Sequence, residues 1–138
     1  MAETDNEADR PKVLIVDDVR ANLVAFKAVL SKLPVEPVTA SSGHEALALL
    51  LRHEFAAILL DVQMPEMDGY ETARLIGDHA SEHPVPIIFI TAFPERLLTG
   101  ERPEPTYLIP KPFQENTVKA AIGQALFFHS PETSVAAE

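Results

Sequence analysis

Five short apolar runs alternate with stretches of helical spacing, and this alternation limits what the chain can fold into more than any other feature. The runs cover residues 12–16, 35–40, 56–60, 86–90 and 107–109. The first of them, KVLIV, is rich in β-branched residues, as expected of a strand that is buried on both faces of a sheet. Each run is therefore predicted to form one strand.

Apolar residues that recur every three or four positions predict helices between these strands. The helices are expected at about residues 20–32, from an N-cap at Ser41 or Ser42 through Leu51, after Gly69 through Ile76, and from Val118 through Ala125. The segment 91–113 carries five prolines and little helical periodicity. The fourth helix in chain order, which would lie there, is expected to be short or displaced.

The regular alternation predicts an α/β fold, a doubly wound five-stranded parallel sheet with helices on both faces. A chain of 138 residues suits one core. We expect a disordered acidic lead at 1–10, a single folded domain at 11–129 and a polar tail at 130–138. The initiating Met1 and the short tail favour a complete protein over a piece of a longer chain.

Charge and composition exclude several kinds of partner. The formal net charge is −10 and the basic residues are scattered, which argues against binding to nucleic acid or to an anionic membrane surface. No apolar run is long enough to span a membrane, and the acidic N-terminus is not a secretion signal, so a cytoplasmic location is expected. The absence of cysteine excludes disulfides and thiolate metal sites. Protein partners or a cation fit better.

Polar residues stand at the ends of four of the predicted strands, with only Pro110 between the last run and Lys111. They are the pair Asp17 and Asp18, then Asp61, Thr91 and Lys111. Because the carboxyl ends of parallel strands meet at one edge of the sheet, these side chains are expected to converge there. Each has an ordinary explanation when taken alone, since an aspartate pair after a strand is a turn or a helix cap about half the time. Their joint position favours a site.

Three carboxylates at one crevice repel one another unless a cation neutralises them or one takes up a proton. With no cysteine and no clustered histidine, oxygen ligands favour Mg²⁺, with Mn²⁺ as a second choice, over zinc. Lys111 adds a cationic anchor and Thr91 adds a hydroxyl donor. The set therefore suits a phosphoryl group that is carried on an aspartate side chain.

The chain resembles the CheY-like receiver domains of response regulators in bacterial two-component systems over about residues 12–128. The resemblance is carried by the acidic pair in VLIVDD, Asp61 in LLDVQMPEMDG, Thr91 in ITA and Lys111 in KPF. The run D-x-x-M-P-x-M-D-G is highly specific, and it occurs together with the other three pieces. Residues 91–113 also resemble the receiver part of PhyR-type regulators of the general stress response.

The resemblance implies a signalling domain rather than an enzyme, with chemistry limited to gaining and losing its own phosphoryl group. Asp61 would accept that group from a histidine kinase or a histidine phosphotransfer protein. Lys111 would pair with the phosphoryl oxygens, or with Asp61 before phosphorylation, and Thr91 would move to hydrogen-bond the group. The resulting change of conformation would signal to a protein partner, or the domain would act as a phosphate sink for a kinase.

The resemblance also implies the ligands of a Mg²⁺ ion. Asp18 and Asp61 would bind the ion directly, together with the backbone carbonyl of Gln63. Asp17 would act through a water molecule. The side chain of Gln63, two residues past the acceptor, would lie at the mouth of the site and modulate its chemistry.

Two positions give the chain features of its own. Phe93 lies two residues past Thr91 and is expected to hinder the attacking water, which would lengthen the phosphorylated lifetime. Typical receivers carry an aromatic switch residue three positions before the lysine, and here that position is Leu108. Neighbouring strand residues point to opposite faces, so Tyr107 cannot take over that role.

Two other functions fit part of the pattern. A haloacid-dehalogenase-type phosphatase also uses an aspartate nucleophile with Mg²⁺, threonine and lysine, but it needs a second aspartate two residues later, where this chain has Gln63. A binding module that had lost phosphorylation would lack one of the chemical residues, yet all of them are present. A phosphorylatable receiver is therefore the preferred interpretation.

Overall fold

Each apolar run forms one strand of a single sheet, as the sequence predicts. The structure, a computed structural model, describes residues 10–61, 72, 74–76, 85–91, 106–111 and 113–128. In chain order the elements are β1 (Lys12–Val16), α1 (Arg20–Leu30), β2 (Glu36–Ala40), α2 (Gly43–Leu50), β3 (Ala57–Asp61), β4 (Ile87–Thr91), β5 (Thr106–Pro110) and α5 (Glu115–Phe128). Residues 72 and 74–76 are also helical.

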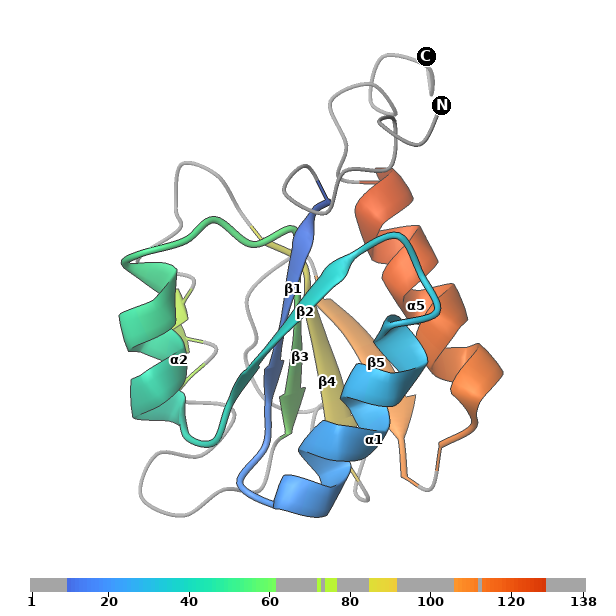
Figure 1. Cartoon of the computed structure of the whole chain (residues 1–138), viewed down its shortest axis with the longest axis horizontal. Coiled ribbons are helices and arrows are strands. Elements are labelled where there is room, and N and C mark those ends of the chain that lie inside the picture. Colours follow the sequence, from blue (N-terminus) through green and yellow to red (C-terminus); the bar gives the residue numbers. More distant parts are fainter. Residues whose placement is uncertain are drawn as a thin grey trace.

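The five strands are all parallel and lie in the order β2-β1-β3-β4-β5 (Figure 1). The chain runs outward from β1 to β2, returns past β1 to β3, and then continues outward through β4 to β5. The direction of winding thus reverses between β1 and β3. Such a reversal leaves a crevice beyond the carboxyl ends of these two strands. The prediction of a doubly wound parallel sheet is confirmed.

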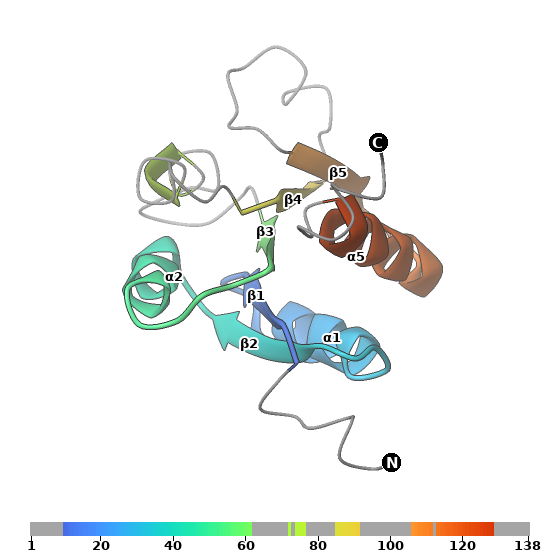
Figure 2. The same cartoon turned by 90° about the horizontal axis from the view of Figure 1, so that it is seen from above.

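Helices cover both faces of the sheet (Figure 2). Helices α1 and α5 lie side by side on one face, and α2 lies on the other. Strand residues alternate between the two faces, so Val13 and Ile15 belong to the core beneath α1 and α5, which also contains Phe26. Leu14 and Val16 belong to the core on the α2 side. Both faces of β1, β3 and β4 are therefore dry, which accounts for their nearly continuous apolar runs.

The start of α2 is set by a reciprocal pair of hydrogen bonds. Ser42 is the N-cap, and its hydroxyl accepts the backbone N–H of Glu45 at 3.0 Å. The carboxylate of Glu45 in turn accepts the backbone N–H of Ser41 at 2.7 Å. The arrangement resembles a capping box, but the carboxylate of Glu45 reaches the residue before the N-cap instead of the N-cap itself. Of the two serines that were candidates for the cap, Ser42 takes the role.

Helix α1 ends at Leu30, two residues before the predicted end. The chain continues in tighter turns, because Lys32 and Leu33 donate their backbone N–H groups to carbonyls three residues back, at 3.2 and 3.0 Å. Pro34 follows, and the residue before a proline is disfavoured in the helical conformation. Leu33, which continues the apolar spacing of Leu23, Phe26 and Leu30, is therefore a residue packed against the core rather than part of a further α-helical turn.

Several predictions lie outside the described residues. They concern the acidic lead over 1–9, the tail over 130–138 and the short or displaced helix between β4 and β5. Within the described ranges, no helix combines the length and the apolar character needed to cross a membrane.

Candidate functional site

The parallel pairing of β1 with β3 brings the predicted acids together. Val16, the last residue of β1, is aligned with Leu60 of β3. The residues that follow, Asp17 and Asp61, therefore lie next to each other at the carboxyl edge. Asp61 is itself the last residue of β3, where its backbone is aligned with Ile90 of β4. The acids thus stand at the point where the winding of the sheet reverses.

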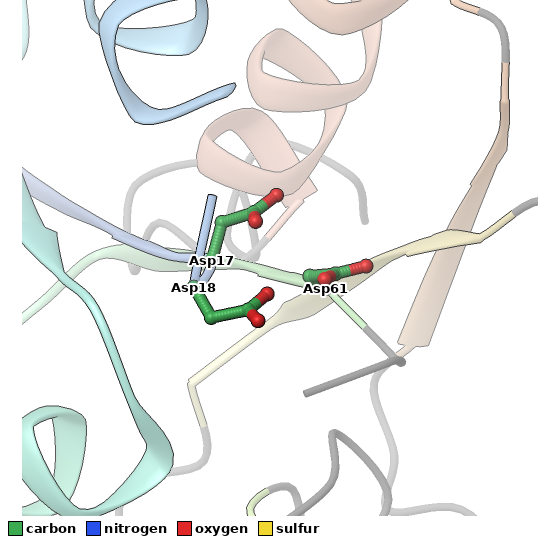
Figure 3. Close-up of side chains that lie close together, drawn as sticks. All are labelled: Asp17, Asp18 and Asp61. Atoms are coloured by element: carbon green, nitrogen blue, oxygen red, sulfur yellow. The ribbon is translucent and has the colours of Figure 1, made fainter. Parts of the chain in front are cut away.

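Three carboxylates form a cluster at this edge (Figure 3). Asp17, Asp18 and Asp61 each offer a carboxylate oxygen, and these three atoms lie within 4.8 Å of one another. Asp17 and Asp61 are buried, with 1% and 3% of their surfaces exposed, whereas Asp18 is exposed. The cluster is therefore walled by the sheet on one side and open to solvent at Asp18.

Asp17 is held at the start of α1. One of its oxygens accepts the backbone N–H of Val19 at 2.9 Å, and the other accepts the side-chain amide N–H of Asn22 at 3.1 Å. Burial raises the pKa of Asp17 above its usual value of 3.8, and the nearby charge of Asp61 raises it further. The two hydrogen bonds oppose this rise. The negative charges of the cluster are therefore under mutual repulsion.

Lys111 supplies the positive charge of the site. It follows the last residue of β5, and its Nζ atom donates to an oxygen of Asp61 at 3.2 Å. Its backbone N–H donates to the carbonyl oxygen of Thr91 at 2.7 Å. Thr91 is the last residue of β4 and is buried. Lysine and threonine are therefore tied together at the ends of neighbouring strands, beside the acids.

The structure brings together Asp17, Asp18, Asp61 and Lys111 by direct contacts or short oxygen separations, and it places Thr91 at the same edge. The predictions for Gln63 and Phe93 lie outside the described residues. Leu108 belongs to β5 by its backbone, and its side chain also lies outside the description.

Two contacts at the site were not foreseen. The first is the hydrogen bond from Asn22, for which an amide in the first turn after an aspartate pair was an available signal. The second is a stack between Phe26 of α1 and Phe113, two residues past Lys111, with ring centroids 4.5 Å apart. The KPF motif was noted for its lysine, and the position of its phenylalanine carried no indication of a partner on α1.

A sheet of this order, with its polar cluster at the reversal point, defines the flavodoxin-like class of doubly wound α/β domains. The chain belongs to the response regulator receiver domain family, whose model matches residues 13–123. The resemblance that the four motifs indicate is therefore confirmed, and the chain is a receiver domain of the kind found in response regulators.

Three relatives show how far this similarity extends. The phyllosphere-induced regulator PhyR of Methylorubrum extorquens is 55% identical over 71 residues, which make up 51% of this chain and 26% of that protein. A structure of the PhyR stress response regulator superposes with a TM-score of 0.75 and 46% identity, over 94% of this chain and 50% of that one. The chemotaxis protein CheY4 of Vibrio cholerae gives a TM-score of 0.77 and 30% identity, over 85% of this chain and 99% of that one. The chain thus spans only a part of the PhyR proteins that it matches.

Proposed function

We propose that Asp61 accepts a phosphoryl group from a phosphohistidine of a histidine kinase or histidine phosphotransfer protein, and that the modified domain signals to a protein partner. The observation that carries the proposal is the surroundings of the Asp61 carboxylate. It is buried, lies 3.2 Å from the Lys111 ammonium, and takes part in a cluster with two other carboxylates. A nucleophilic carboxylate beside a fixed cation suits phosphoryl transfer, which depends mainly on positioning and electrostatics.

The residues present fit a divalent cation. The three carboxylate oxygens lie within 4.8 Å of one another and are hard ligands. The negative charge of Asp61 contributes to the raised pKa of Asp17, and a bound cation would relieve the repulsion between these two carboxylates. We propose that Asp18, Asp61 and the backbone carbonyl of Gln63 hold Mg²⁺ directly, with Asp17 acting through water, and that Mn²⁺ can replace it. When bound, the ion would offset the negative charge of the transferring phosphoryl group.

The transfer balances without a further reactant. An oxygen of Asp61 forms a bond to phosphorus as the bond between phosphorus and the histidine nitrogen breaks. The histidine nitrogen keeps the electron pair of the broken bond, and the ring, where it does not already carry a proton on its other nitrogen, takes up one proton from water to give neutral histidine. Lys111 then pairs with the phosphoryl oxygens. The Thr91 side chain moves so that its hydroxyl donates to the phosphoryl group. This movement couples phosphorylation to the conformation at the ends of β4 and β5.

The similarity to PhyR supports a role in a stress response. The likeness covers 94% of this chain at 46% identity, and the solved protein is described as a stress response regulator. We propose that this domain serves a pathway of that kind by docking to a protein partner. A phosphate sink is the alternative, and the lifetime of the phosphorylated domain distinguishes the two, because a sink requires rapid loss of phosphate. Phe93 would lengthen that lifetime, and Phe93→Ala would shorten it.

The central test is labelling of Asp61 by a small phosphodonor such as acetyl phosphate, with intact-protein mass as the readout. The wild-type chain should gain one phosphoryl group with Mg²⁺ present and none with excess chelator. Asp61→Asn should abolish the gain, while Glu54→Gln, which removes an exposed acid, should leave it intact. Labelling that persists in Asp61→Asn would mean that another residue is the acceptor. Transfer from purified histidine kinases of the host would then identify the donor.

A further inference from the structure

One face of helix α1 contacts both the acidic cluster, through Asp17, and the segment that carries Lys111, through Phe113. The sequence motifs of the site do not include the residues of this face. We propose that this face positions two charged groups of the site, and that Asn22 orients the carboxylate of Asp17. One turn later, Phe26 holds the segment that carries Lys111. The inference rests on the proposed function of Asp61, because it concerns residues that serve the same site without touching the phosphoryl group.

The first contact fixes the plane of the Asp17 carboxylate. Both of its oxygens accept a hydrogen bond from the beginning of α1, one from the Val19 backbone and one from the Asn22 side chain. Two donors, one on each oxygen, restrain the rotation of the carboxylate about its Cβ–Cγ bond. Only 1% of the Asp17 surface is exposed, so competition from bulk water for these hydrogen bonds is weak. The position of α1 therefore sets the direction in which the free lone pairs of the Asp17 oxygens point.

The second contact restrains the chain next to Lys111. The rings of Phe26 and Phe113 are stacked with an angle of 15° between their planes and centroids 4.5 Å apart. Phe26 is fully buried in the core beneath α1 and α5, and Phe113 packs against the same core. A lysine side chain has many rotamers, so fixing its backbone narrows the region that the ammonium samples. The hydrogen bond from Lys111 to Thr91 restrains the chain before Phe113, and the stack restrains it after.

The two contacts are linked by helix geometry. Asn22 and Phe26 are four residues apart on α1 and therefore lie on the same face. The turn that follows α1 also contacts the start of α5, where exposed Lys32 donates to Glu115 at 2.9 Å, just after Phe113. A shift of α1 would therefore move the acid and the lysine segment together. The helix sets the separation between the cation-binding side of the site and the lysine side.

The amide contact is tested by the affinity for Mg²⁺, measured by calorimetric titration of the unphosphorylated chain. Asn22→Leu keeps the volume and removes the donor, and we expect the dissociation constant for Mg²⁺ to rise about 10-fold, as for other residues that orient metal ligands. Asn22→Ser, which replaces the amide donor by a shorter hydroxyl donor, should recover part of the loss. The same change at an exposed asparagine of α5, Asn116→Leu, is the matched control. Wild-type affinity in Asn22→Leu would overturn this half of the inference.

The aromatic contact is tested by the rate of Asp61 labelling with acetyl phosphate at saturating Mg²⁺. Phe113→Ala should slow labelling about 10-fold, since small misplacements of a charged group are costly in transfer reactions, and it should weaken Mg²⁺ binding less than Asn22→Leu does. Phe113→Tyr, which keeps the stack, should restore the rate. Phe55→Leu, a change in the other core cluster before β3, controls for lost packing alone and should label normally at a temperature where all variants are folded.

The two levels of failure can be told apart. If the wild-type chain is labelled on Asp61 while Phe113→Ala is labelled equally fast and Asn22→Leu binds Mg²⁺ as tightly as wild type, the proposed function stands and the role of α1 is refuted. A wild-type chain that is not labelled at all would overturn the proposed function, and this inference with it.

Discussion

The interior of β3 and its carboxyl end are buried to nearly the same degree, yet they hold opposite kinds of residue. Leu60 and Asp61 are neighbours in β3, with 0% and 3% of their surfaces exposed. Burial of the leucine stabilises the fold, whereas burial of the aspartate beside Asp17 opposes it, because two like charges are kept from water. The dry strands thus hold in place a charged edge that would not assemble alone.

The largest effect should come from the strand interior. Leu60→Ala removes a fully buried side chain from the core on the α2 side and should lower the free energy of unfolding by about 2–5 kcal/mol. Urea denaturation followed by circular dichroism measures the change. Leu51→Ala is the matched control, because that leucine is 73% exposed and its loss should cost less than about 0.5 kcal/mol. Equal effects at the two positions would contradict the assignment of the core.

Binding of Mg²⁺ should offset the destabilisation caused by the clustered carboxylates of Asp17, Asp18 and Asp61. At a free concentration of roughly 100 times the dissociation constant, a ligand that binds only the folded state adds about 2.7 kcal/mol to the free energy of unfolding. We therefore expect Mg²⁺ to raise the melting temperature of the wild-type chain, and a chelator to remove the gain. Asp18→Asn, which replaces an exposed member of the cluster, should lose most of it. An undiminished gain in that variant would place the ion elsewhere.

Without Mg²⁺, the charged edge should respond to pH in a defined direction. The pKa of Asp17 is raised in the folded state, chiefly by burial and also by Asp61, so from pH 3.8 upward the unfolded chain loses this proton first. The folded state then binds more protons than the unfolded state, and stability contributed by this group falls as pH rises until the raised pKa is passed. Asp17→Asn should remove that fall and be more stable than wild type near neutral pH, by on the order of 1 kcal/mol, a typical size for one substitution.

The measurement is the difference in unfolding free energy between Asp17→Asn and the wild-type chain across the acidic range. This difference isolates Asp17 from the other carboxylates. It should grow from pH 3.8 upward and then level off, and it should shrink or change sign when Mg²⁺ is added, because the cation compensates the charge that the variant lacks. A difference that is independent of pH would mean that the raised pKa does not govern stability.

The same contrast explains what could be predicted from the sequence. Apolar runs in the sequence indicate the interiors of the strands. Because the strands are parallel, Asp17, Asp61 and Lys111 must then meet at the carboxyl edge of the sheet. The runs mark burial and not backbone pairing, so the third strand was predicted to stop at Leu60, while β3 continues through Asp61, which is still aligned with Ile90.

The apolar pattern of the sequence does not predict contacts between segments that are distant in the chain. Helical spacing placed Phe26 on the apolar face of α1 but gave no information on which residue it would meet. Its partner Phe113 lies in a segment that reaches α1 only because β5 is at one edge of the sheet and α5 crosses back over the same face as α1. The hydrogen bond of Asn22 depends likewise on the angle at which α1 leaves β1, which local sequence does not fix.

The smallest effect should come from a substitution that changes the stability of the fold without affecting the acidic cluster. Gly123 lies within α5 on an exposed position, and a Cβ atom added there would meet nothing within 4 Å. Alanine is more favourable than glycine inside a helix by roughly 0.8–1 kcal/mol, because glycine loses more backbone freedom on folding. Gly123→Ala should therefore raise the free energy of unfolding by up to about this amount, measured by urea denaturation with and without Mg²⁺. Since the change is remote from the charged edge, the gain should be the same in both conditions, in contrast to that of Asp17→Asn; a gain that depended on Mg²⁺ would show that α5 transmits changes to the acids through its link with α1.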